Sequence, residues 1–369
     1  MGRLVTALVV ALALGVGACS YTRSLLPDMK ELDAGGETAG LTWEVVIRHR
    51  LLANKDEQAR FEQDLAAFIE EYRHWHKAEE GIGFFANIRD TDLLHERVEG
   101  VLPKNYAVNY DPGTNSYRCH DEASPVCRGR NADWIMDRTR SVILRFGAGR
   151  CRWILDGVEA EDACERTVSV SVDEEKPVQV VRIDDGARAE TVVLVRDIVI
   201  VALGDSFSAG EGNPHRQWRA GGRPAAWLDA RCHRSLMSGP ALTAAYLARS
   251  NPHVSVTFLH YGCSGASVAD GLVTPWSMLE TTADIREQYA AFGIRGREFD
   301  RLRVATAEAQ LHDVPLSQLR QAEADLTVDG RLIQPDFIIV SIGGNDIGFA
   351  SIVSALAHQD STSVDLGFD

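Results

Sequence analysis

Three short segments of the sequence place a serine, a glycine and an asparagine directly after apolar runs. Ser206 lies in Gly-Asp-Ser, Gly265 in Cys-Ser-Gly-Ala, and Asn345 in Gly-Gly-Asn-Asp. A serine hydroxyl attacks acyl carbons, and fixed N–H donors stabilise the oxyanion that then develops. The backbone N–H groups of Ser206 and Gly265 and the side-chain amide of Asn345 are the candidate donors. This set of groups predicts acyl transfer through an acyl-serine intermediate.

The part of the chain that must position these groups alternates between strand and helix patterns. Apolar strand-like runs cover 198–203, 254–259 and 336–342, and helical patterns cover 238–249 and much of 281–326. Alternation of this kind predicts a parallel sheet covered by helices. Open α/β sheets bind ligands at the carboxyl ends of their strands. We therefore expect the three segments to lie close together at one edge of the sheet.

The three segments resemble, in order, the first three conserved blocks of the SGNH, or GDSL-type, hydrolases. The longer string from Gly204 to Gly212, Gly-Asp-Ser-Phe-Ser-Ala-Gly-Glu-Gly, and the string Cys-His-Arg-Ser at 232–235 look like the branch of secreted actinobacterial lipases and esterases. The resemblance covers about residues 198 to 350.

This resemblance implies a flavodoxin-like three-layer α/β/α fold, with Ser206 as the nucleophile. It implies that the N–H groups of Ser206 and Gly265 and the side chain of Asn345 form the oxyanion hole. It assigns Asp205 and Asp346 to shaping their turns, and it supports a disulfide between the segments at 232 and 263. The implied activity is hydrolysis of carboxylic esters, either by a lipase or esterase or by a carbohydrate O-deacetylase, with no cofactor.

One part of the family pattern is missing from the sequence. The family's fourth block, Asp-x-x-His, supplies the general base, and no such pair follows the third block here. His358 is expected to be a surface residue, and His233 and His260 do not match the family's base. We expect that the chain is a piece of a longer enzyme. The alternative is an inactive SGNH-fold lipoprotein that binds or scaffolds at the cell envelope.

The N-terminus has the pattern of an export signal. Arg3 precedes the apolar stretch 4–16, and Val-Gly-Ala leads into Cys19. This tetrapeptide resembles the lipobox of bacterial lipoproteins, which implies that Cys19 is lipidated and anchors the protein to a membrane. The alternative is an ordinary signal peptide that happens to contain a cysteine. We expect an exported protein on the periplasmic or outer-membrane side of the cell envelope.

Six cysteines remain after Cys19, an even number, as a disulfide framework in an oxidising compartment requires. Six cysteines allow fifteen pairings. Proximity in sequence favours three of them, namely Cys119 with Cys127, Cys151 with Cys164, and Cys232 with Cys263. Zinc binding is the competing explanation, but Cys-x-x-Cys and His-x-x-x-His spacings do not occur. We expect disulfides and no metal site.

The sequence ahead of the predicted hydrolase domain divides into three parts. Residues 1–19 are the predicted lipoprotein signal peptide. Residues 20–140 form an N-terminal region with an amphipathic helix from Glu57 and a loop pinned by its own disulfide. Residues 141–196 contain short β-rich runs that predict a small antiparallel sandwich, loosely similar to immunoglobulin-like and polycystic-kidney-disease-like modules. Residues 197–369 are the hydrolase domain, in partial form.

Composition limits the partners. The formal net charge of -15 argues against nucleic-acid binding, which depends on Lys and Arg neutralising phosphates. Glu211, in the loop after the candidate nucleophile, is expected to be a solvated carboxylate. The expected partners are therefore an ester substrate, an acylated lipid or an acylated glycan, and a membrane reached through the lipid anchor. The sequence does not choose between the two substrates.

Overall fold

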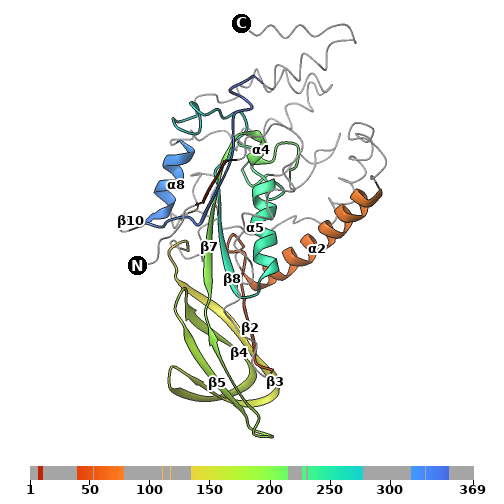
Figure 1. The fold of residues 1–369 in the computed structure, drawn as a ribbon, viewed down its shortest axis with the longest axis vertical. Coiled ribbons are helices and arrows are strands. Elements are labelled where there is room, and N and C mark those ends of the chain that lie inside the picture. Colours follow the sequence, from red (N-terminus) through yellow and green to blue (C-terminus); the bar gives the residue numbers. More distant parts are fainter. Residues whose placement is uncertain are drawn as a thin grey trace, which may run out of the picture.

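The computed structural model describes residues 7–10, 40–52, 54–78, 110, 117, 134–214, 227–229, 232–276, 317–328 and 330–348. These residues form a mixed α/β structure with one parallel sheet and one curled antiparallel sheet, at different heights in Figure 1. The predicted α/β class is confirmed at this level. None of the described helices is long and apolar enough to cross a membrane.

The parallel sheet has four strands in the order β1-β11-β7-β8. They are β1 (Ala7–Val10), β7 (Arg196–Gly204), β8 (Val254–His260) and β11 (Phe337–Ser341). All neighbouring pairs in this sheet are parallel. The three strands predicted from the sequence are therefore confirmed, with their carboxyl ends at one edge.

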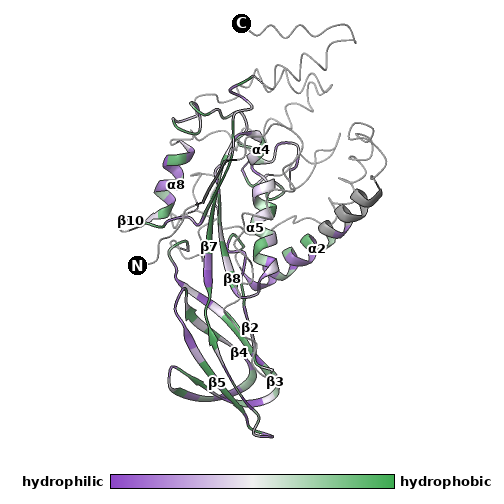
Figure 2. Ribbon diagram, in the orientation of Figure 1, coloured by the Kyte–Doolittle hydropathy of each residue, from purple (hydrophilic) through white to green (hydrophobic). Residues whose placement is uncertain are grey.

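The central strands form because their residues are apolar on both faces. Every residue of β8 is buried, and β7 is buried from Ile198 onward. Both strands are apolar along most of their length in Figure 2. Near-continuous apolar runs are the pattern of parallel strands that are covered on both sides.

Two helices provide that cover, on opposite sides of the sheet in Figure 1. Helix α5 (Gly239–Ser250) begins after Ser238, whose side chain caps it by accepting from the backbone N–H of residue 241. Helix α8 (Gln318–Leu326) is capped in the same way by Ser317. A serine at this position satisfies an N–H group that the helix leaves unpaired. Strands β9 (Thr327–Val328) and β10 (Arg331–Leu332) form a short hairpin after α8.

The antiparallel sheet consists of five strands. They are β2 (Thr42–Val45), β3 (Thr139–Leu155), β4 (Val158–Ser171), β5 (Lys176–Arg182) and β6 (Arg188–Val193). The order is β2-β3-β5-β6, and β4 pairs with β3. These strands make one curled sheet, so the prediction of a sandwich of two sheets is wrong.

The prediction failed because β3 is one long strand, whereas the sequence pattern divides it into two short β-rich runs. Its pairing with β4 shifts register between Arg145 and Arg150. Gly147 and Gly149, within this shift, have φ of 75° and 99°. A bulge with glycines bends a strand without ending it. The exposed bulge therefore looks like a turn in the sequence, while the strand continues and curls the sheet.

A disulfide fastens the core of this sheet. Cys151 on β3 is bonded to Cys164 on β4, as predicted. The neighbouring Trp153 is fully buried, and its indole N–H donates to the carbonyl oxygen of Ala163 at 2.9 Å. The predicted pairing of Cys119 with Cys127 and the predicted lipidation of Cys19 lie outside the described residues.

The predicted amphipathic helix is also present, as α2 (Lys55–Ala78). Asn54 precedes it and accepts the backbone N–H of Glu57 at 3.0 Å. Phe61 and Leu65 are buried and pack in one cluster with Ala245 of α5. Helix α2 therefore lies against the helix that covers the parallel sheet.

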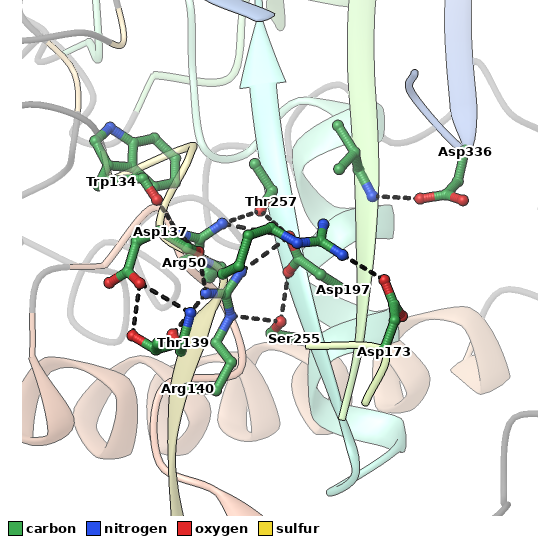
Figure 3. A network of polar contacts seen from close by, with 12 residues as sticks. Arg50, Trp134, Asp137, Thr139, Arg140, Asp173, Asp197, Ser255, Thr257 and Asp336 are labelled. Atoms are coloured by element: carbon green, nitrogen blue, oxygen red, sulfur yellow. Dashed lines mark hydrogen bonds and ion pairs between the residues drawn. The ribbon is translucent and has the colours of Figure 1, made fainter. Parts of the chain in front are cut away.

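A buried ionic network joins the two sheets (Figure 3). Asp197, at the start of β7, pairs with Arg140 at 3.0 Å and with Arg50 at 3.3 Å, and it accepts the hydroxyl groups of Ser255 and Thr257. Burial alone would raise the pKa of Asp197, but the two guanidinium charges and the hydroxyl donors outweigh it and hold this pKa below its ordinary value. The network lies at the end of β7 opposite to Ser206.

Residues 7–10, inside the predicted signal peptide, lie in this structure as strand β1 at the edge of the parallel sheet. Their partner is β11, with Ala7 opposite Phe337 and Val10 opposite Val340. A short apolar run that predicts an export signal is also compatible with a strand. Removal of residues 1–19 on export stays a prediction.

Candidate active site

The three sequence segments meet at the carboxyl edge of the parallel sheet. The backbone N–H of Cys263, after β8, donates to the carbonyl oxygen of Gly204 at 2.9 Å. The backbone N–H of Asp205 donates to the carbonyl oxygen of Ser341, the last residue of β11, also at 2.9 Å. The ends of β7, β8 and β11 are thus tied to one another by hydrogen bonds, as the predicted sheet requires.

Asp205 connects the first segment to the third. Its buried carboxylate accepts the backbone N–H of Phe207 through one oxygen and that of Gly344 through the other, both at 3.1 Å. The first of these bonds caps the short helix α4 (Ser206–Ala209). Burial raises the pKa of this carboxyl group above its ordinary value, although the hydrogen bonds act to lower it. Asp205 therefore shapes the turn, which is the role expected from the sequence.

Gly204 is required by the closeness of β7 and β11. It has a φ of 137°, and a Cβ atom at this position would lie 1.9 Å from the carbonyl oxygen of Ser341. The side chain of Gln318, on α8, forms hydrogen bonds with both backbone groups of Gly204. The amide oxygen of Gln318 accepts the N–H of Gly204 at 2.7 Å, and the amide nitrogen donates to its carbonyl oxygen at 2.8 Å.

The two backbone donors predicted for the oxyanion hole are unpaired. Within the described part of the chain, the N–H groups of Ser206 and Gly265 donate to no acceptor. Ser206 is half-buried and Gly265 is exposed, so both are accessible. Unpaired donors at an accessible strand end are the groups that a ligand oxygen can use.

Gly265 also has a conformation that favours glycine. Its φ is 85°, in the left-handed region, and an added Cβ would lie 3.3 Å from the ring of Trp276. A side chain here would therefore be strained and would also crowd the indole.

Asn345, the third predicted donor, is held by the second segment. Its side-chain nitrogen donates to the carbonyl oxygen of Ala266 at 2.8 Å. An amide nitrogen carries two hydrogens, so the second remains for a ligand. The next residue, Asp346, accepts the backbone N–H of Val268 with both carboxylate oxygens at 3.1 Å. These bonds connect the second and third segments directly.

A second disulfide and a buried arginine hold the segment that carries Gly265. Cys232 is bonded to Cys263, as predicted. The fully buried Arg234 donates to the carbonyl oxygens of Tyr261 and Gly262 at 3.3 and 2.8 Å. Sequence reasoning did not assign Arg234 a role, although it lies in the Cys-His-Arg-Ser string that carries part of the resemblance.

Glu211 is more constrained than a solvated loop carboxylate. One of its oxygens lies 2.7 Å from Nδ1 of His233 and accepts the hydroxyl of Ser264 at 2.7 Å. Trp227 stacks on the His233 ring at a centroid distance of 4.6 Å. Burial would raise the pKa of Glu211, but the hydrogen bonds and charge of these partners outweigh it and lower this pKa. The expectation of a merely solvated side chain was therefore incomplete.

The histidines do not supply Ser206 with a base in the described part of the chain. In these residues Ser206 is hydrogen-bonded only through its backbone carbonyl oxygen, which accepts the N–H groups of Gly210 and Glu211. Burial and the charge of Arg234 lower the pKa of His260 to about 3, and its Nδ1 atom has no partner within these residues. His358 lies outside them.

Within the described ranges, no three His, Cys, Asp or Glu side chains are grouped as a metal site would require. The comparisons with known proteins add no identification, because no family model, curated protein or solved structure matches the chain.

Proposed function

We propose that the protein is an exported serine hydrolase that cleaves carboxylic esters through an acyl-serine intermediate. The observation that carries the proposal is that, in the described part of the chain, the N–H groups of Ser206 and Gly265 have no acceptor, while Asn345 donates to Ala266, the residue after Gly265. Ser206 is half-buried and Gly265 is exposed, so both N–H groups can donate to a ligand oxygen at this edge of the sheet. The two disulfides are consistent with export.

The roles follow from the chemistry of acyl transfer. The Oγ atom of Ser206 attacks the ester carbonyl carbon and forms a C–O bond to it. The C–O bond to the alcohol breaks, and the proton of the serine hydroxyl leaves with the alcohol. The three donors bind the oxyanion of the tetrahedral intermediate, and each donor of this type contributes about 10²–10³ in rate. Water then releases the acyl group as a carboxylate. A flavodoxin-like SGNH fold is part of the proposal, supported by the parallel order of β11, β7 and β8 and by helices on both sides.

The test is ester turnover by matched serine variants. Ser206→Ala removes the nucleophile and should abolish hydrolysis of a p-nitrophenyl ester by the purified full chain. Ser208→Ala is the control, since it removes a buried hydroxyl of the same turn that has no hydrogen-bond partner in the described part of the chain. It should retain turnover. Equal turnover by wild type and Ser206→Ala would refute the proposal.

A second candidate function is binding without catalysis. It is favoured by one observation, that no histidine of the described residues is hydrogen-bonded to the Ser206 hydroxyl. An inactive protein would bind an ester through the same three donors and release it unchanged. Ester binding by equilibrium dialysis, with intact ester recovered and Ser206 unmodified, would support this function over hydrolysis.

A further inference from the structure

Exposed apolar side chains follow each of the three segments of the candidate site. Phe207 comes directly after Ser206, Val268 three positions after Gly265, and Ile347 two positions after Asn345. Their exposed fractions are 59%, 44% and 69%. Single exposed apolar side chains are common, but a contiguous group of them marks a binding surface, so what matters is whether the backbone brings these three together.

Hydrogen bonds link the backbone positions of these side chains. Asp205 accepts the N–H groups of Phe207 and Gly344, and the N–H of Ile347 donates to the carbonyl oxygen of Gly343 at 3.3 Å. The first and third segments therefore carry Phe207 and Ile347 on adjoining turns.

The second segment joins the same surface. The N–H of Val268 donates to Asp346, the residue before Ile347. The N–H of Val273 donates to the carbonyl oxygen of Val268 at 3.2 Å, and Val273 is 54% exposed. We call the four side chains Phe207, Val268, Val273 and Ile347 the apolar rim.

Polar side chains near the site form a separate cluster from the apolar rim. Glu211, His233 and Ser264 bond to one another, beside the disulfide that joins the 232 and 263 segments. Ser206 therefore has two different groups of side chains in its surroundings, this polar cluster and the apolar rim.

We propose that the apolar rim binds the acyl chain of the ester and makes the enzyme prefer chains of several carbons over acetyl groups. This inference rests on the proposed function. An acyl group held by Ser206, Gly265 and Asn345 must extend from the carbonyl carbon across the surface next to these residues. Phe207, Val268 and Ile347 lie one to three positions along the sequence from these residues, and a hydrogen bond links Val273 to Val268. Contact of the rim with the acyl chain removes apolar area from water.

The experiment compares two soluble esters, p-nitrophenyl acetate and p-nitrophenyl octanoate, below the concentrations at which the latter forms micelles. The readout is the ratio of kcat/KM for octanoate to that for acetate. For the full chain we expect a ratio of about 10 or more, because added methylenes in an apolar site change kcat/KM by about 10-fold or more. The double variant Val268→Ser with Ile347→Ser should lower this ratio about 10-fold.

The matched control is Val158→Ser, on the antiparallel sheet, where the side chain is 69% exposed like that of Ile347. It should leave the ratio unchanged. Thermal unfolding of all variants confirms that each is folded. A wild-type preference for acetate, or an unchanged ratio in the double variant, would overturn the inference.

Two other outcomes would show that the apolar rim contacts something other than an acyl chain. Loss of binding to phosphatidylcholine vesicles with an unchanged ratio would show that the rim contacts a membrane, and a change from dimer to monomer would show that it contacts a second copy. Either result contradicts the acyl-chain assignment. If neither ester is cleaved, or if Ser206→Ala cleaves both, the proposed function itself fails and the rim assignment fails with it.

Discussion

The substitution Asp197→Asn should destabilise the protein strongly, because it leaves two buried arginines without their carboxylate. The side chains of Asp197, Arg50 and Arg140 are only 4%, 7% and 5% exposed. Breaking a buried ion pair by removing one partner typically costs about 3–5 kcal/mol. Asparagine keeps the size of the side chain and an oxygen that accepts hydroxyl groups, so we expect the low end, about 3 kcal/mol.

The control for this variant is Asp173→Asn, which breaks a pair with Arg138. Both side chains of that pair are about half exposed, at 55% and 52%. Exposed pairs contribute about 0–1 kcal/mol. Urea unfolding at pH 7, followed by circular dichroism, measures the two free energies. A cost below about 1 kcal/mol for Asp197→Asn, or equal costs for both variants, would refute the assigned role of the network.

The pH dependence gives a second check on the same network. The pKa of Asp197 is lowered in the folded state, while an unfolded aspartate has a pKa of about 3.9. A carboxyl group with a depressed folded pKa contributes stability above its unfolded pKa and loses it as the pH falls through the folded value. The difference between wild type and Asp197→Asn should therefore be largest above about pH 4 and shrink below it. A difference that stays constant down to pH 2 would contradict this explanation.

Two further predictions concern the ends of the strands. Replacing Cys232 and its partner by serine should cost about 3–4 kcal/mol and lower ester hydrolysis, because this disulfide holds the segment of the oxyanion donor. Replacing Cys151 and its partner should cost about 3 kcal/mol without lowering hydrolysis by the folded protein, and equal effects on kcat would contradict the assignment. Gly204→Ala should cost at least about 3 kcal/mol in urea unfolding and abolish turnover, because its Cβ would meet the carbonyl oxygen of Ser341 at 1.9 Å. Gly157→Ala, where no atom lies within 4 Å, should cost only about 1 kcal/mol for its positive φ, and similar losses in the two variants would disprove the steric argument.

The sequence predicted three of the four parallel strands, because β7, β8 and β11 are continuous apolar runs, whereas β1 lies in the predicted signal peptide. The runs at 198–203 and 254–259 became β7 and β8 almost residue for residue. Both described disulfides were predicted from spacing and, for Cys232, from the family resemblance. Local signals of this kind do not depend on distant parts of the chain.

What the sequence could not predict depends on contacts between distant residues. Gln318 bonds the backbone of Gly204 across 114 positions, and nothing in the pattern of α8 marks it. The pairing of Glu211 with His233 depends on the approach of two loops. The curled sheet was mistaken for a sandwich because the bulge at Gly147 interrupts the apolar pattern of one strand.

The most direct test of the central claim is labelling of the full chain with a fluorophosphonate, which reacts with activated serines. Peptide mass spectrometry then locates the label. We predict one label on Ser206, absent from Ser206→Ala and retained in Ser208→Ala. A protein that takes up no label, or that carries it on another serine, would contradict the assignment of Ser206 as the nucleophile.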